Sequence, residues 1–156
     1  MRNISKILFA AFVFGSMPSC SLSEQPDKEK QRIEKCVTGF TEAYFNFGLN
    51  EAAEYCTPES RKYLSFLASN IREEDLEELN KQEVTTSFEI EDVSLGANDS
   101  VAYAIITVEN YMDVEKIEEV GRMVDKGKFR LKTVRRDSKW YVKMEGPLRN
   151  EMQNLD

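Results

Sequence analysis

The spacing of apolar residues divides the chain into two parts. From about residue 27 to residue 81, apolar residues recur every three or four positions, as on one face of an α-helix. From Val84 onward the period changes to two, which is typical of β-strands with one buried face. Helices followed by sequential strands predict an α+β domain, in which the strands form an antiparallel meander.

The longest helix is predicted from about Asp27 to Phe47, and Gly48 provides a natural stop. Gly39 lies inside this helix and indicates a close approach by another element, since glycine is otherwise unfavourable there. The apolar face of the helix consists of Ile33, Val37, Phe40, Tyr44 and Phe47, with Cys36 and Ala43 beside them.

Shorter helices are predicted between this helix and the strands. One starts at Asn50, whose side chain can cap it, and another starts at Thr57-Pro58. A further helix covers residues 72–81 and is rich in acidic residues. Its inward positions are Leu76 and Leu79. It lacks the alternating ligands and turn glycine of a calcium loop, so a solvated helix face is the preferred interpretation.

The predicted strands start at about residues 84, 100, 123 and 140. The set that should face the long helix is Phe88, Ile90, Ala102, Ala104, Ile106, Val108, Phe129, Leu131, Trp140, Val142 and Met144. The opposite set mixes tyrosines with charged residues and consists of Glu89, Tyr103, Thr107, Glu109, Tyr111, Lys128, Arg130, Lys132, Tyr141 and Lys143. The sheet therefore has one apolar face and one mixed face.

The opening stretch, residues 1–21, has a different pattern. Arg2 and Lys6 give it a basic start, an apolar run over 7–14 follows, and small residues lead to Cys20. The run is about half the roughly 20 residues that span a bilayer as a helix, so an export signal is the preferred interpretation. The stretch resembles a bacterial lipoprotein signal peptide, in which the cysteine is lipidated and becomes the new N-terminus.

This resemblance implies an exported protein that is anchored to a bacterial membrane through acyl chains on its cysteine. The expected location is the outer membrane, facing the periplasm or the surface. Simple secretion and an uncleaved anchor remain as alternatives. The expected organisation is a signal peptide at 1–19, a lipidated cysteine and flexible tether at 20–31, a folded domain at 32–146 and a C-terminal tail at 147–156.

Charge and composition argue against several classes of function. The 156 residues include 28 acidic and 21 basic side chains, and the net charge of −7 becomes −9 once residues 1–19 are removed. Such an acidic chain is a poor nucleic-acid binder, because binding to phosphates needs cations. The chain contains no histidine, which removes the commonest general base and the commonest metal ligand. We expect no cofactor and no metal site.

Cys36 and Cys56 remain once Cys20 is assigned to the anchor. An exported chain meets an oxidising compartment, so an even remainder allows a disulfide between them. Alternatively they are two small buried apolar residues, because each lies on the apolar face of its predicted helix. Their unequal distances from the turn near Gly48 also argue against bridge geometry.

Several stretches resemble the cystatin-like, nuclear-transport-factor-two-like (NTF2-like) superfold. They are Val37–Tyr44, Gly48–Tyr55, Thr57–Glu59 and Asp137–Val142. By pattern the chain is similar to small bacterial lipoproteins that carry a domain of unknown function. The resemblance implies helices in the concave side of a curved four-stranded antiparallel sheet. The superfold hosts ketosteroid-isomerase-like enzymes as well as non-catalytic binding modules, so the fold does not decide the function.

We expect a non-enzymatic binding module that uses the mouth of the helix–sheet cone or the outer sheet face. A protein partner or a second copy of the chain could bind the outer face, since tyrosines suit interfaces. The residues for this surface are Tyr103, Glu109, Tyr111, Arg130 and Tyr141. Ordinary cross-strand charge pairing is the alternative for this face. A basic stretch over 126–143 could also lie against anionic lipid headgroups near the tether.

The alternative is a small enzyme that uses a carboxylate in the cone pocket. Asp92 is the candidate base, because continuing the phase of Phe88 and Ile90 places it inward. Tyr44 or Tyr63 could supply a hydroxyl group. Otherwise Asp92 begins a turn and both tyrosines are core residues.

Overall fold

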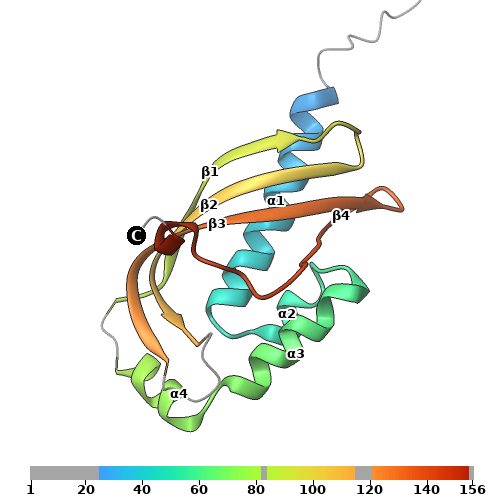
Figure 1. The fold of residues 1–156 in the computed structure, drawn as a ribbon. Helices are drawn as coiled ribbons and strands as arrows, with labels where there is room; N and C mark the ends of the chain where they lie inside the picture. Colours follow the sequence, from blue (N-terminus) through green and yellow to red (C-terminus); the bar gives the residue numbers. More distant parts are fainter. Residues whose placement is uncertain (1–24, 82–83, 115–120, 155–156) are drawn as a thin grey trace, which may run out of the picture.

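Helices make up the first half of the described chain and strands the second (Figure 1). A computed structural model describes residues 25–81, 84–114 and 121–154, so the expected signal peptide and Cys20 lie outside the described residues. The helices are α1 Gln25–Phe45, α2 Leu49–Ala52, the 3-10 helix η2 Pro58–Ser60, α3 Arg61–Asn70, α4 Glu73–Asn80 and the 3-10 helix η3 Glu151–Asn154. Within these ranges, no helix has the length and apolarity needed to cross a membrane.

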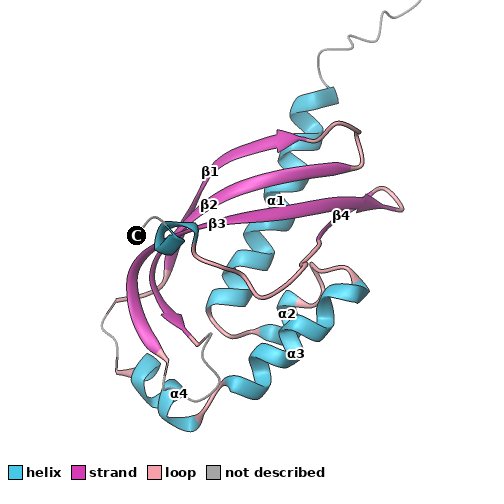
Figure 2. Ribbon diagram, viewed as in Figure 1, coloured by secondary structure: helices cyan, strands magenta, loops and turns pink. Residues whose placement is uncertain are grey.

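The strands form one antiparallel sheet of four strands in the order β1-β2-β3-β4, which confirms the predicted meander. They are β1 Ser87–Leu95, β2 Val101–Asp113, β3 Arg122–Arg136 and β4 Lys139–Val142. Figure 2 shows that β2 and β3 are long, whereas β4 is short and pairs only with the end of β3. Asp137 and Ser138 join β3 to β4 with φ values of 48° and 65°, as a type I′ turn requires.

The core lies between α1 and the concave face of the sheet, whose long strands bend around the helix (Figure 1). The predicted inward face of β2 is confirmed, since Ala102, Ala104, Ile106 and Val108 are each 0% exposed. From the helix side, Phe40 is also 0% exposed. Trp140 on β4 is buried, and its indole N–H donates to Glu29 of α1 at 2.9 Å, which lowers the pKa of that carboxyl.

Helix α1 begins and ends two residues earlier than the sequence predicts, so the second half of the expected tether is helical. At its C-terminus Phe47, not Gly48, adopts the left-handed conformation, with φ 58°. The N–H of Gly48 donates to the carbonyl of Ala43 at 2.9 Å. The N–H of Phe47 donates to the carbonyl of Tyr44 at 3.2 Å. These two bonds form a Schellman end, which terminates the helix.

The close approach expected at Gly39 is confirmed, because the ring of Tyr55 occupies the space where a Cβ would stand. The carbonyl of Tyr55 accepts the backbone N–H of Val142 at 2.8 Å. The segment after α2 is thereby fixed between α1 and the edge strand β4. A glycine in the helix is thus explained by packing rather than by a bend.

The inward face of α4 differs from the predicted one. Leu76 is 44% exposed, whereas Asp75 is 1% exposed. The Asp75 carboxylate accepts the N–H of Arg72 at 2.8 Å and the N–H of Gly121 at 2.6 Å. A carboxylate in the first helical turn is favoured by the exposed N–H groups there. The rest of this acidic face is exposed as predicted, and Asp75 ties α4 to the start of β3.

The folded domain continues beyond the predicted end at residue 146. We call residues 143–151 the C-terminal strap. Leu148 packs against the core, and Asn150 is 8% exposed. The Asn150 side chain accepts the N–H of Lys128 at 3.0 Å and donates to the hydroxyl of Tyr111 at 3.1 Å. The strap therefore covers part of the β3 edge that the short β4 leaves unpaired.

Candidate functional site

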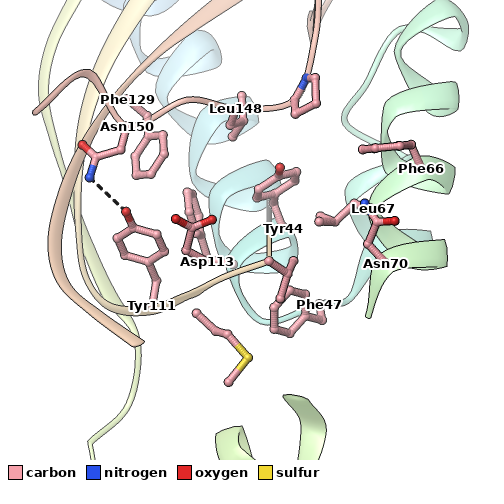
Figure 3. A pocket seen from close by; sticks show the side chains of 14 residues that line it. Tyr44, Phe47, Phe66, Leu67, Asn70, Tyr111, Asp113, Phe129, Leu148 and Asn150 are labelled. Carbon is pink, nitrogen blue, oxygen red and sulfur yellow. Dashed lines mark hydrogen bonds between the residues drawn. The ribbon is translucent and has the colours of Figure 1, made fainter. Parts of the chain in front are cut away.

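A small apolar pocket lies where the C-terminal end of α1 meets α3, the end of β2 and the strap (Figure 3). Its volume is about 50 Å³. It is lined by Tyr44, Phe45, Phe47, Phe66, Leu67, Asn70, Tyr111, Met112, Asp113, Val114, Phe129, Pro147, Leu148 and Asn150. This is the mouth of the helix–sheet cone, and we call it the cone pocket.

Packed aromatic rings form one wall of the cone pocket. The ring centroid of Phe45 lies 5.1 Å from that of Tyr44 and 4.9 Å from that of Phe129. Tyr111 completes the cluster, with its centroid 5.4 Å from both Phe45 and Phe129. None of these rings belongs to a residue more than 8% exposed. Because the rings hold one another in tilted and edge-to-face arrangements, this wall is preformed.

Besides the hydroxyls of Tyr44 and Tyr111, three amide or carboxylate side chains interrupt the apolar lining. Asn150 is bonded as described above, and Asp113 forms an ion pair with Arg122 at 3.5 Å. The Nδ2 of Asn70 is buried and has no hydrogen-bond partner among the described residues. Leaving such a donor unpaired costs about 1–3 kcal/mol. A hydrogen-bond acceptor on a bound molecule would remove this cost.

Phe47 contributes a ring to the pocket from an unfavourable backbone conformation (Figure 3). A left-handed φ costs a bulky residue about 1–2 kcal/mol, because its Cβ approaches the following carbonyl. The Schellman end of α1 imposes this conformation on Phe47. Backbone strain of this kind concentrates at binding sites, where the surrounding structure maintains it.

Among the three residues predicted for the pocket, Tyr44 lines it and the other two do not. Tyr63 lies on α3 and donates its hydroxyl to the carbonyl of Glu145 at 3.0 Å. It therefore fixes the strap to α3 rather than facing a ligand.

The prediction that Asp92 faces the pocket is wrong, because its side chain is exposed. Ile90 pairs with Ile106, but Asp92 pairs with Ile105, so a bulge in β1 shifts the register by one residue. A shift of one residue moves each following side chain to the opposite face of the sheet. The side chain of Asp92 consequently lies on the outer face of the sheet. It cannot serve as the base of an enzyme that uses the cone pocket.

Tyr111 is also misplaced by the sequence pattern, since it is 3% exposed in the core instead of lying on the outer face. Asn110 interrupts the alternation of β2 with a left-handed φ of 54°. Gly127 provides the space, because a Cβ there would lie 2.6 Å from the Tyr111 hydroxyl. The other residues predicted for the outer face, Tyr103, Glu109, Arg130 and Tyr141, alternate with the buried positions of their strands.

The charges on the outer face pair across the strands. Lys126 contacts Glu109 at 2.9 Å, and Lys128 contacts Glu91 at 2.7 Å. The hydrogen bond from Lys128 lowers the pKa of Glu91. Cross-strand pairing, the alternative interpretation of this face, is therefore present. Binding of a partner or a second copy there stays a prediction.

Cys36 and Cys56 are both buried free thiols in this structure. The disulfide between them, one of the two interpretations of the sequence, is not formed here. Burial raises the pKa of Cys36 to about 11 and that of Cys56 to about 12. The Cys36 thiol lies 3.8 Å from the carbonyl of Tyr55. Protonated thiols are poor nucleophiles and poor metal ligands. Among the described residues, no group of three or more Cys, Asp or Glu side chains could hold a metal ion.

The sequence pattern missed three polar residues of the pocket: Asn70, Asp113 and Asn150. Asn70 ends α3, and Asp113 ends β2, so neither lies within a periodic run. Asn150 lies in the predicted tail, where the pair Pro147-Leu148 was an apolar signal of a packed segment. Residues at the ends of elements carry function without taking part in the hydrophobic period.

No protein-family model and no curated protein sequence matches this chain. Its fold is similar to solved structures. A protein of unknown function from Mycobacterium tuberculosis aligns with a TM-score of 0.50 and 13% identity, over 85% of this chain and 78% of that chain. An NTF-2-like protein of unknown function from Shewanella oneidensis aligns with a TM-score of 0.48 and 12% identity, over 72% of this chain and 93% of that chain.

An Ntf2-like protein involved in plasmid conjugation aligns with a TM-score of 0.41 and 18% identity. It covers 100% of this chain, which spans 50% of the length of that protein. At these identities the likeness concerns the fold alone, which the mycobacterial structure and the strand order of the sheet support. The chain therefore has an α+β fold of helices on a four-stranded antiparallel sheet, as the NTF2-like resemblance implied.

Proposed function

We propose that this domain is a non-enzymatic binding module whose cone pocket takes a small, largely apolar molecule with one hydrogen-bond acceptor. The unpartnered Nδ2 of Asn70 in an aromatic pocket is the observation that carries the proposal. A preformed apolar pocket selects its ligand by shape, and the few polar groups in the pocket fix the orientation of that ligand.

The size of the pocket limits the ligand. A cavity of about 150 Å³ encloses a benzene ring, whereas the cone pocket holds about 50 Å³. A ligand would therefore insert one edge or a short chain past Phe47 and Leu67, and the rest of it would stay at the mouth.

Three observations support binding over catalysis. The chain has no histidine, and the predicted base Asp92 lies outside the pocket. The carboxylate that does line the pocket, Asp113, is ion-paired with Arg122. A pocket enzyme would have to use Asp113 as its base and give up this pair.

Benzamide and toluene test the ligand chemistry, because they share a ring but only benzamide has a carbonyl acceptor. We expect benzamide to bind the full chain about five- to tenfold more tightly than toluene, since one hydrogen bond contributes about 1 kcal/mol. The measurement is the change in NMR signals of Leu67 and Leu148 with ligand concentration. Asn70→Leu should abolish the preference for benzamide.

Asn50→Leu provides the matched control, because Asn50 is an exposed asparagine outside the cone pocket. It should leave the preference intact. Leu67→Trp fills the pocket and should prevent both molecules from binding. Equal affinity for benzamide and toluene in the unaltered chain would contradict the role of Asn70, and binding that survives Leu67→Trp would contradict the site.

We further propose that the domain is exported and tethered to a bacterial membrane through lipid on Cys20. The basic start, the short apolar run and the small residues before the cysteine support this. Cys20→Ser should move the protein from the membrane pellet to the soluble fraction of a bacterial host, because two or more acyl chains are what make anchoring stable. Ser21→Ala, the control, should stay in the pellet. Retention of the Cys20→Ser variant in the membrane pellet would contradict the proposal.

A further inference from the structure

A second and larger hollow lies between the C-terminal strap and the outer side of β3. The strap starts on the β3 edge, where the N–H of Lys143 donates to the carbonyl of Lys132 at 2.8 Å. It returns to that edge at Asn150, which accepts the N–H of Lys128 at 3.0 Å. Among the described residues, no hydrogen bond joins the strap to the β3 backbone between these two points. The hollow has a volume of about 450 Å³, and we call it the strap groove.

Cationic side chains outnumber acidic ones in the strap groove. They are Arg130, Lys132, Lys143 and Arg149, and the acidic side chains beside them are Glu145 and Glu151. The groove thus has a local excess of positive charge, although the whole chain has a net charge of −7. A concentration of charge opposite to that of the protein indicates a site for a ligand of the protein's own sign.

Two of the cations form close ion pairs with glutamates, and the other two do not. Lys132 contacts Glu145 at 2.7 Å, and Arg130 contacts Glu151 at 3.3 Å. Lys143 and Arg149 form no ion pair with any residue in the described part of the chain. They lie on either side of Gly146, and neither the ammonium group of Lys143 nor the guanidinium group of Arg149 is held in a close ion pair, although the charge of Lys143 also acts on the nearby Glu145.

We propose that the strap groove binds a small polyanion that bears phosphate or carboxylate groups. Guanidinium and ammonium groups are the side chains that recognise such anions, with arginine giving paired hydrogen bonds and lysine a point charge. Tyr103 also lines the groove, and a tyrosine hydroxyl is a hydrogen-bond donor. An anion with two negative charges matches the excess positive charge of the groove.

The existing ion pairs leave room for such a ligand. The side chains of Glu145 and Glu151 are 65% and 43% exposed, so both can turn toward water. Exposed ion pairs contribute little to stability and are screened by salt. Lys132 and Arg130 can therefore exchange their glutamates for a ligand anion at small cost.

The strap groove is chemically separate from the cone pocket, although Pro147 and Leu148 line both. Successive strap residues point to different sides, since Asn150 lines only the cone pocket and Arg149 only the strap groove. The two sites can therefore be tested with separate substitutions, and failure at one leaves the other standing.

The test uses inorganic diphosphate with the full chain, followed by NMR at the amides of Gly146 and Arg149. We expect saturable shifts there, an affinity that falls as the salt concentration rises, and at least a tenfold loss of affinity in Lys143→Ala/Arg149→Ala. The matched control is Lys35→Ala/Arg61→Ala, which removes the same two charges from exposed sites outside the groove. Affinity for diphosphate should change less than twofold in this control.

A second arm identifies the source of the anion. Vesicles of phosphatidylglycerol, with phosphatidylcholine vesicles as reference, present the same phosphate chemistry as a headgroup. Binding to diphosphate that depends on Lys143 and Arg149 supports a free anion, and binding only to phosphatidylglycerol with the same dependence supports a headgroup. No binding to either probe, or equal losses in the groove variant and the control, overturns the proposal.

Discussion

Replacing Phe40 by alanine is expected to lower the free energy of unfolding by about 3–5 kcal/mol, a large share of the stability of a domain of this size. Phe40 is the largest of the fully buried side chains, and its ring centroid lies 5.3 Å from that of Tyr44. Its loss leaves a cavity between α1 and the sheet that a close-packed interior fills only in part. Denaturant unfolding of the full chain, analysed at constant slope, measures the change.

Phe66→Ala is the control, because it removes the same ring from α3 at a position that is 41% exposed. It should cost less than about 1 kcal/mol, since much of that ring already contacts water. Similar losses in both variants would show that the core does not lie between α1 and the sheet.

The residues that the sequence predicted well are those whose environment repeats along the chain. The alternating positions of β2 from Ala102 to Val108 are completely buried, and Phe40 on the apolar face of α1 is buried opposite them. Each of these positions is supported by several neighbours of the same period, so one irregular residue does not alter the pattern. The fold class follows from the change of period alone.

The errors at Asp92 and Tyr111 have one physical origin. A period of two assumes an unbroken strand, but β1 has a bulge before Asp92, and β2 has a left-handed residue at Asn110. Asparagine tolerates that conformation better than most residues, so Asn110 was an available signal. The bulge in β1 depends on its pairing with β2 and leaves no such mark in the local sequence.

The polar residues of the two sites were harder to predict because each acts across a long stretch of chain. Asn150 reaches β3 and Tyr111, which lie 22 and 39 residues away. Arg149 joins Lys143 only because the strap leaves the β3 edge between them. The C-terminal strap, whose sequence shows no hydrophobic period, therefore supplies residues to both the cone pocket and the strap groove.

Gly127→Ala is the second substitution with a large expected effect, a loss of about 1–3 kcal/mol in the free energy of unfolding. A Cβ at this position would lie 2.6 Å from the hydroxyl of Tyr111 and 2.9 Å from Nδ2 of Asn150. Tyr111 is 3% exposed and Asn150 is 8% exposed, so neither side chain can move into water to relieve the overlap. Gly146→Ala is the control, because a Cβ there has no neighbour within 4 Å. It should change the stability by less than about 0.5 kcal/mol.

The effect of Gly127→Ala should also reach the cone pocket, since the two displaced side chains, Tyr111 and Asn150, line it. Tyr111→Phe separates overlap from hydrogen bonding. Alone it should cost about 1 kcal/mol, because Asn150 loses its acceptor, whereas combined with Gly127→Ala it should cost less than the sum of the two single changes. This coupling arises because the hydroxyl that overlaps the new methyl group is absent from phenylalanine. Strict additivity in the double variant would mean that the Tyr111 hydroxyl does not overlap the new methyl group. A Gly127→Ala loss no larger than that of Gly146→Ala would mean that Tyr111 does not occupy the space beside this glycine.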